Sequence, residues 1–176
     1  MKNPFVTNGY VSPEYFCDRE KETAKIVSLL TNENNIALIS PRRLGKTDLL
    51  RHCFGQPEIK EHYHTFIIDI YATSSVRDFV NVCGKAVLDE LRPKGKSVLG
   101  TFLNVLASLR SEITFDMNGQ PTWGIGLGAI TNPSATLDEI FSYLNNAGKP
   151  CLIAIDEFQQ ITKYADDPNI EAALRT

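Results

Sequence analysis

The segment that runs from Ile36 to Leu50 limits the possible folds of this chain more than any other. It opens with four apolar residues, passes through Gly45-Lys46-Thr47 and ends in two leucines. This order predicts a strand buried on both faces, a tight loop and the start of a helix. Such a loop aims backbone N–H groups, an ammonium and a hydroxyl at one point, which is how proteins hold a nucleoside triphosphate and its Mg²⁺.

One position departs from the usual phosphate-binding pattern, Gly-x-x-x-x-Gly-Lys-Ser/Thr, because Ser40 stands in place of the first glycine. A serine forced into positive φ there would cost about 1 kcal/mol. The tripeptide alone also fits an ordinary surface loop closed by a helix start, but the strand–loop–helix context favours a phosphate loop. The residues expected to bind the nucleotide are Ser40, Pro41, Arg42, Arg43, Leu44, Gly45, Lys46, Thr47 and Asp48.

A second segment, residues 149–160, supports the same chemistry. A Lys-Pro turn is followed by five apolar residues and then by two adjacent acids, Asp156 and Glu157. A buried parallel strand would place both carboxylates at its carboxyl end, where ligands bind in open α/β sheets. There Asp156 would hold Mg²⁺, directly or through water, and Glu157 would orient or deprotonate the attacking water. The alternative interpretation is that the two acids cap the following helix.

Three motifs occur together in the chain: Phe16-Cys-Asp-Arg19-Glu20, Ser40-Pro-Arg-Arg-Leu-Gly-Lys-Thr47 and Ile155-Asp-Glu-Phe-Gln159. Together they resemble the archaeal-type ATPases of the AAA+/STAND branch of P-loop proteins. Those ATPases typically show Phe-x-x-Arg-Glu, Gly-Pro-Arg-Arg-x-Gly-Lys-Thr and an apolar run before Asp-Glu. The resemblance, which spans about residues 12–176, implies an α/β fold of the ASCE-type P-loop class, with a parallel sheet flanked by helices. It implies ATP as the nucleotide, because the chain has no Asn-Lys-x-Asp guanine-reading motif.

The expected function is ATP binding with slow, switch-like hydrolysis that drives a conformational change. Lys46 and Glu157 are the expected catalytic residues: Lys46 would neutralise the β- and γ-phosphates, and Glu157 would prepare the water. Thr47 and Asp156 are the expected ligands of Mg²⁺. The resemblance also implies an arginine supplied by another subunit, and the expected partners are therefore a second copy of the chain or another protein.

Two other functions fit the same sequence. The chain could hold the nucleotide without catalysis, as a structural ligand, or serve as a scaffold that recruits a protein. It could also belong to an initiator-like DNA ATPase, by analogy with the family alone. The net charge of −3 provides no basic field for DNA. A winged-helix domain outside this chain would have to supply that surface.

Composition and cysteine use favour a cytoplasmic globular protein. With 43% hydrophobic and 22% charged residues, the 176 residues can bury one sizeable core. The N-terminus lacks an apolar signal core, and no apolar run is long enough to predict a membrane span. Cys17, Cys53, Cys83 and Cys151 have neither disulfide-framework nor zinc-site spacing, so we expect reduced thiols.

Residues 1–15 are expected to form an N-terminal segment near the nucleotide site, followed by the ATPase domain over residues 16–176. Periodicity and start signals predict helices over residues 19–32, 48–54, 76–91, 97–109, 137–144 and 169–175. Asp18, Ser75 and Thr136 are the expected N-caps of three of these helices. Besides the strand at 36–39, buried strands are expected over residues 64–71 and 151–155.

Residues 111–130 predict a β-hairpin inserted between two helices, outside the main sheet. Residues 113–117 alternate apolar and polar side chains, and an Asn-Gly turn follows. Glycines at positions 124, 126 and 128 leave one face of the returning strand bare. That face could receive a partner beside Trp123, but packing onto the chain's own helix is the favoured interpretation.

In the P-loop branch that carries the extra glutamate, a further strand lies between the phosphate-loop strand and the Asp-Glu strand. This chain stops soon after the Asp-Glu strand, so strands 36–39 and 151–155 would face an empty slot. Each unpaired buried backbone group there would cost about 1–3 kcal/mol. We therefore expect an incomplete ATPase core, with the sensor strand, a helical lid and a winged-helix domain in a missing C-terminal part.

Several charged residues have two interpretations. Arg42 or Arg43 would contact phosphate or an acid of a neighbouring subunit, or would pair with a local carboxylate. Arg19-Glu20 would tie the N-terminal segment to the core near the adenine, or would form an ordinary ion pair at a helix start. Asp69, at the end of the second expected strand, would face the site or cap a helix.

Overall fold

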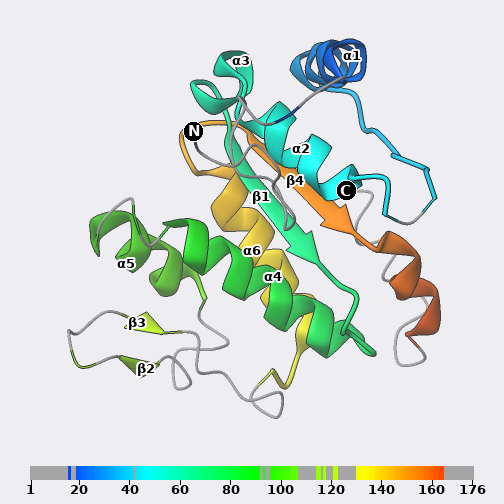
Figure 1. Ribbon diagram of the computed structural model, residues 1–176. Coiled ribbons are helices and arrows are strands. Elements are labelled where there is room, and N and C mark those ends of the chain that lie inside the picture. Colours follow the sequence, from blue (N-terminus) through cyan, green and yellow to red (C-terminus); the bar gives the residue numbers. More distant parts are fainter. Residues whose placement is uncertain are drawn as a thin grey trace. The chain divides into compact units, whose positions relative to one another are not determined.

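Figure 1 shows a computed structural model of the chain, which describes Phe16 and residues 19–41, 43–91, 93, 96–106, 114–115, 117, 121–122 and 130–164. The chain divides into two compact units, Met1–Thr65 and Phe66–Thr176. Each unit contains its own cluster of buried apolar side chains. Within the described ranges, no helix is both long enough and apolar enough to cross a membrane.

The first unit packs three helices, α1 (Glu20–Thr31), α2 (Lys46–Phe54) and α3 (Pro57–Lys60). Ile26 of α1 is buried with Leu49 and Cys53 of α2. Leu49 and Cys53 share one face of α2 because residues four apart are neighbours on a helix surface. Further apolar side chains pack partly buried against this cluster: Phe16, Val27, Leu30, Ile36 and Leu38. The cluster holds α2, and with it the loop that precedes α2, against α1.

Residues 34–41 join α1 to the phosphate loop without forming a strand, so the buried strand expected at 36–39 is wrong. Ile36 and Leu38 are half-buried against the α1–α2 cluster, whereas Ile39 is 95% exposed. Alternate residues thus differ in burial, as they do wherever side chains point to opposite sides of an extended backbone. No strand in the described parts of the chain pairs with this segment, and its apolar packing in the first unit comes from the side that carries Ile36 and Leu38.

The second unit combines a two-stranded parallel sheet with helices. Strand β1 (His64–Asp69) pairs with β4 (Cys151–Asp156), and both arrows point the same way in Figure 1. The helices between them in sequence are α4 (Val76–Leu91), α5 (Lys96–Val105) and α6 (Pro133–Asn145), and the 3₁₀ helix η5 (Phe158–Lys163) follows β4. Parallel neighbours need such a crossover, because a tight turn can join only antiparallel strands.

The strands expected at 64–71 and 151–155 are therefore present, but β4 is less buried than a central parallel strand. None of its six residues is fully buried, and Ile153 is 38% exposed. In β1, Phe66 and Ile68 are the fully buried residues. The expected burial on both faces is therefore not reached in β4. Each of the two strands also has one strand neighbour in the part of the chain that the structure describes.

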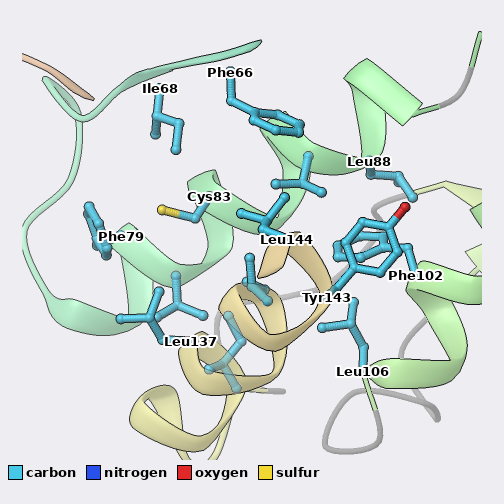
Figure 2. Packing of buried hydrophobic residues seen from close by; sticks show 14 of the residues in the cluster. Phe66, Ile68, Phe79, Cys83, Leu88, Phe102, Leu106, Leu137, Tyr143 and Leu144 are labelled. Atoms are coloured by element: carbon cyan, nitrogen blue, oxygen red, sulfur yellow. The ribbon is translucent and has the colours of Figure 1, made fainter. Parts of the chain in front are cut away.

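Helices α4, α5 and α6 supply most of the core of the second unit (Figure 2). Phe79 and Leu88 of α4, Phe102 of α5 and Ile140 of α6 are all fully buried. The rings of Phe102 and Tyr143 meet edge to face with their centroids 4.9 Å apart. Burial of each large apolar side chain stabilises the fold by roughly 1.5–3 kcal/mol. This core supports the strands that lead to the acidic pair.

The helix starts confirm one expected cap and correct another. Ser75 Oγ accepts the backbone N–H of Asp78 at 3.1 Å, so Ser75 caps α4 as expected. Thr136 does not cap α6, because it lies inside the helix and is fully buried. Asn132 is the cap, and its side chain accepts a backbone N–H of the first turn at 3.2 Å. Pro133 at the first helical position suits this earlier start, since its missing N–H needs no partner there.

Two short strands, β2 (Thr114–Phe115) and β3 (Pro121–Thr122), pair antiparallel with Thr114 opposite Thr122. The rest of residues 111–130, including the Asn-Gly turn and the alternate glycines, lies outside the described residues, so the inserted hairpin stays a prediction. Residues 1–15, Asp18, residues 107–109 and the helix expected at 169–175 also lie outside the described residues.

Candidate functional site

The expected phosphate loop turns sharply just before α2. Gly45, the N-cap residue of α2, has a φ of +67°, and Arg43 has a φ of +65°. Glycine adopts this left-handed conformation without a steric penalty, whereas Arg43 pays about 1–2 kcal/mol for it. Gly45 is followed at once by right-handed helical residues. Such a change of hand turns successive backbone N–H groups toward one concave side that binds anions.

Ser40, which replaces the first glycine of the usual loop, does not have a positive φ. Among the described loop residues, Arg43 and Gly45 are the left-handed ones, so the penalty expected for a serine at position 40 does not arise. The Ser40 hydroxyl donates to the carbonyl oxygen of Pro41 at 3.4 Å. Serine is therefore compatible with this loop conformation.

The side chain of Lys46, the first residue of α2, folds back over the loop. Its Nζ donates to the carbonyl oxygens of Ser40 at 3.1 Å and of Pro41 at 3.4 Å. The ammonium thus lies against the loop that leads into the N-terminus of α2, where the helix dipole already favours an anion. Thr47, the next residue, is half-buried. Asp48 forms an ion pair with a residue of its own helix, Arg51, at 3.8 Å.

The Phe-x-x-Arg-Glu motif contacts both ends of α2. Nη1 of Arg19 donates to the carbonyl oxygens of Leu44 at 3.0 Å and of Gly45 at 3.4 Å. Toward the other end of the helix, Phe16 stacks on His52 with ring centroids 4.2 Å apart. The motif therefore braces the helix that carries the phosphate loop. Its expected position near an adenine stays a prediction.

The acidic pair lies at the carboxyl end of β4. Asp156 is the last residue of the strand, and its Oδ1 accepts the backbone N–H of Glu157 at 2.9 Å. Glu157 has a φ of +58° and, as the N-cap of η5, makes no side-chain capping hydrogen bond. The helix-capping alternative therefore does not describe Glu157. The side-chain amide of Gln159 donates to Oε2 of Glu157 at 2.5 Å, so it holds this carboxylate beside the strand end.

The segment after the acidic pair is anchored to the turn that follows β1. Nε2 of Gln160 donates to the carbonyl oxygen of Thr73 at 3.0 Å, and the Thr73 hydroxyl forms a hydrogen bond with the Tyr164 hydroxyl. Asp69 accepts the N–H of Tyr71 at 2.9 Å and so caps this turn. These contacts hold the carboxyl ends of the two parallel strands together at one edge of the sheet.

The structure brings together the loop residues of the first unit, from Ser40 to Asp48, and separately the acids of the second unit, Asp156 and Glu157. Arg42 lies outside the described residues. That loop and acids meet around one nucleotide stays a prediction. The contact between Gln159 and Glu157 was not among the features predicted from the sequence, although a glutamine two residues after an acid on a tight turn is a usable signal.

The oxygen atoms of the two expected metal ligands suit Mg²⁺. Among the described residues, no group of three or more His, Cys, Asp and Glu side chains is arranged to hold a metal ion. Mg²⁺ does not need such a group, because it keeps several waters and usually binds one or two carboxylates together with phosphate oxygens. The hydroxyl of Thr47 and the carboxylate of Asp156 are hard oxygen donors and fit this chemistry.

The sequence of residues 16–174 matches a family described as an ATPase domain predominantly from Archaea, and the chain belongs to this family. An uncharacterized ATP-binding protein of Methanocaldococcus jannaschii is 28% identical over 160 residues, which cover 85% of this chain and 44% of the relative. A second one from the same organism is 27% identical over 157 residues, with 83% and 40% covered. The chain thus spans less than half the length of these curated relatives. No solved structure matches the chain.

Proposed function

We propose that this chain is the ATP-binding part of a P-loop ATPase, in which Mg²⁺-dependent hydrolysis of ATP drives a conformational change. The observation that carries the proposal is the loop before α2, which combines a left-handed Gly45, a helix N-terminus and the Lys46 ammonium. Membership of an ATPase-domain family supports it, and so do the names of the two ATP-binding relatives.

The loop binds the polyphosphate through charge and oriented N–H groups. Lys46 exchanges the carbonyl oxygens of Ser40 and Pro41 for phosphate oxygens, which carry negative charge and are therefore stronger acceptors. The loop leads directly into the N-terminus of α2, where the helix dipole and the N–H groups of a first helical turn favour an anion.

The acids complete the site. The oxygen atoms of Thr47 and Asp156 hold Mg²⁺, which neutralises charge on the phosphates when it is bound. Glu157 orients the attacking water and accepts its proton. The hydrogen bond from Gln159 keeps the Glu157 carboxylate in place for this task.

We further place the chain in the AAA+/STAND branch, with an ASCE-type sheet order, the Ser40–Thr47 loop as Walker A and the β4 acids as Walker B. The contact between the Phe-x-x-Arg-Glu motif and the loop supports this branch. Cys53 and Cys83 are buried free thiols, which suits a reducing cytoplasm. A second copy of the chain or another protein would supply the catalytic arginine, and DNA would be a partner only through an additional winged-helix domain.

Calorimetric titration with Mg·ATP tests nucleotide binding. We expect the wild-type chain to bind, and Lys46→Ala to weaken binding by at least about tenfold because it removes a charged donor. Lys25→Ala is the matched control, since Lys25 is an exposed lysine of α1 in the same unit. Binding that survives Lys46→Ala undiminished would contradict the proposal.

A further inference from the structure

The side chain of Arg19 reaches the phosphate loop from the residue just before α1. Arg19 is the N-cap of α1, yet its side chain makes no capping hydrogen bond. Instead Nη1 donates to the carbonyl oxygens of Leu44 at 3.0 Å and Gly45 at 3.4 Å. Its Nε lies 3.7 Å from a carboxylate oxygen of Glu22, and the side chain is 27% exposed. One guanidinium therefore joins the start of α1 to the last two peptide carbonyls before α2.

The geometry of the peptide bond gives this contact a consequence for anion binding. In a planar trans peptide the carbonyl and the following N–H point in opposite directions, and the described chain contains no cis peptide. The carbonyl of Leu44 shares a peptide with the N–H of Gly45, and the carbonyl of Gly45 shares one with the N–H of Lys46. A donor that holds both carbonyls on one side therefore aims both N–H groups at the other side.

The chemistry of the side chain suits this task. A guanidinium is planar and carries five N–H donors in a rigid fork, so it can bind two neighbouring carbonyls and a carboxylate at once. The carbonyl of Gly45 also accepts the N–H of Leu49 at 2.9 Å, which is the first hydrogen bond of α2. Arg19 thus acts on the peptide where the left-handed turn becomes helix. A lysine would keep the charge but lose the fork.

We infer that Arg19 is a positioning residue of the phosphate site, which holds the N–H groups of Gly45 and Lys46 toward the polyphosphate of the nucleotide. The inference rests on the proposed function. Arg19 itself acts from the carbonyl side of these peptides and reaches the ligand only through them. A purely structural role, in which Arg19 joins α1 to α2, would change stability but not the affinity of the folded protein.

Two ligands and one exchange measurement separate these roles. Mg·ATP and inorganic triphosphate are titrated into wild type, Arg19→Ala and Arg19→Lys well below their unfolding temperatures. Because triphosphate has no base or sugar, its affinity reports on the phosphate loop alone. Hydrogen exchange of the Gly45 and Lys46 amides is measured with and without saturating triphosphate, because amides that donate to the phosphate are protected when it binds.

Arg19→Ala is expected to lower the affinity for both ligands by the same factor, about tenfold, because a charged donor to two carbonyls is lost. Arg19→Lys is expected to recover less than half of this loss on a logarithmic scale, because the charge is kept without the fork. Saturating triphosphate is expected to slow exchange of the two loop amides by at least about tenfold in wild type, and by clearly less in Arg19→Ala.

Two variants serve as controls. Arg51→Ala removes the same charge from the same unit. Arg51 pairs with Asp48 on α2, whereas the bonds to the carbonyls of Leu44 and Gly45 come from Arg19. Glu22→Gln removes the ion-pair partner of Arg19 and leaves the carbonyl bonds. Both are expected to stay within about threefold of wild-type affinity for both ligands.

Failure of the proposed function and failure of the role of Arg19 would give different results. A wild-type chain that binds neither ligand would overturn the proposed function, and with it the assignment of the two N–H groups to a phosphate. Wild-type affinity and wild-type protection of the two loop amides by triphosphate in a folded Arg19→Ala would overturn the role of Arg19 and leave the proposed function standing. Full recovery by Arg19→Lys would show that charge acts here rather than positioning.

Discussion

The ammonium nitrogen of Lys46 lies 3.1 Å from the carbonyl oxygen of Ser40. Ser40 thus contributes a backbone group to the lysine, and its own φ is not in the left-handed region. The residue that departs from the usual loop pattern therefore neither strains the loop nor offers its side chain to the ammonium.

Ser40→Gly is for this reason expected to leave the Kd for Mg·ATP within about threefold of wild type. The free energy of unfolding should fall by about 0.5–1 kcal/mol, because glycine has more freedom to lose on folding. Calorimetry and urea unfolding measure the two effects. A tenfold gain in affinity would show that serine does strain the loop.

Glu157→Gln is expected to reduce ATP turnover by at least about 100-fold, because an amide cannot accept the proton of the attacking water. The Kd for Mg·ATP should stay close to wild type, since the change preserves size and leaves the phosphate loop intact. Steady-state phosphate release and calorimetry are compared in both forms. Equal, negligible turnover in the full-length wild type and variant would favour a non-catalytic nucleotide-binding module.

Gln159→Ala removes the hydrogen bond to the Glu157 carboxylate. We expect kcat to fall by about three- to tenfold while the Kd for Mg·ATP is unchanged, because one neighbouring hydrogen bond to a charged group is lost. Thr162→Ala is the control on the same 3₁₀ helix, because Thr162 is exposed and its hydroxyl donates to the backbone carbonyl of Gln159 rather than to Glu157. A variant Gln159→Ala with wild-type kcat would rule out the holding role.

Phe102→Ala should lower the free energy of unfolding by about 3–5 kcal/mol, because Phe102 is 0% exposed and its removal leaves a cavity in the second unit. Val98→Ala on the same helix is the control: Val98 is 37% exposed, so we expect a loss below about 1 kcal/mol. Urea unfolding followed by circular dichroism gives both values. Equal losses would mean that α5 does not pack as the structure shows.

The start of α4 should respond to pH through Asp78. Burial alone raises the pKa of Asp78, but hydrogen bonds from the N–H and hydroxyl of Ser74 and from Ser75 outweigh it and lower the pKa below its usual value. A lowered folded-state pKa stabilises the fold above the unfolded value, about 3.9, and this contribution is lost as the pH falls through the folded pKa.

Asp78→Asn should accordingly be less stable than wild type at pH 7, and the difference should shrink as the pH drops below about 4. Urea midpoints measured from pH 7 to pH 3 provide the comparison. A difference that stays constant over this range would contradict the hydrogen-bonded carboxylate.

Patterns between nearby residues predicted much of the fold. The apolar spacing from Val76 to Leu91 matches α4, and Ser75 caps it because a serine hydroxyl can reach the N–H three residues on. The start of α6 differs from its prediction, because Asn132 and not Thr136 is the cap. Thr136 and Asn132 are both good capping residues, and only the burial of Thr136 under the core shows that the helix starts earlier.

For the candidate site, the sequence by itself determined the local chemistry: the tight loop at Gly45, the helix that follows the loop, and the two acids at the carboxyl end of β4. These features depend on residues next to one another in the chain, where backbone freedom and helix-start preferences act. Tertiary structure alone decided that Arg19 holds the carbonyl of Leu44 and that Ile36 is half-buried while Ile39 is exposed. Such contacts depend on which segments far apart in the sequence pack together, and the periodicity within one segment does not predict that packing.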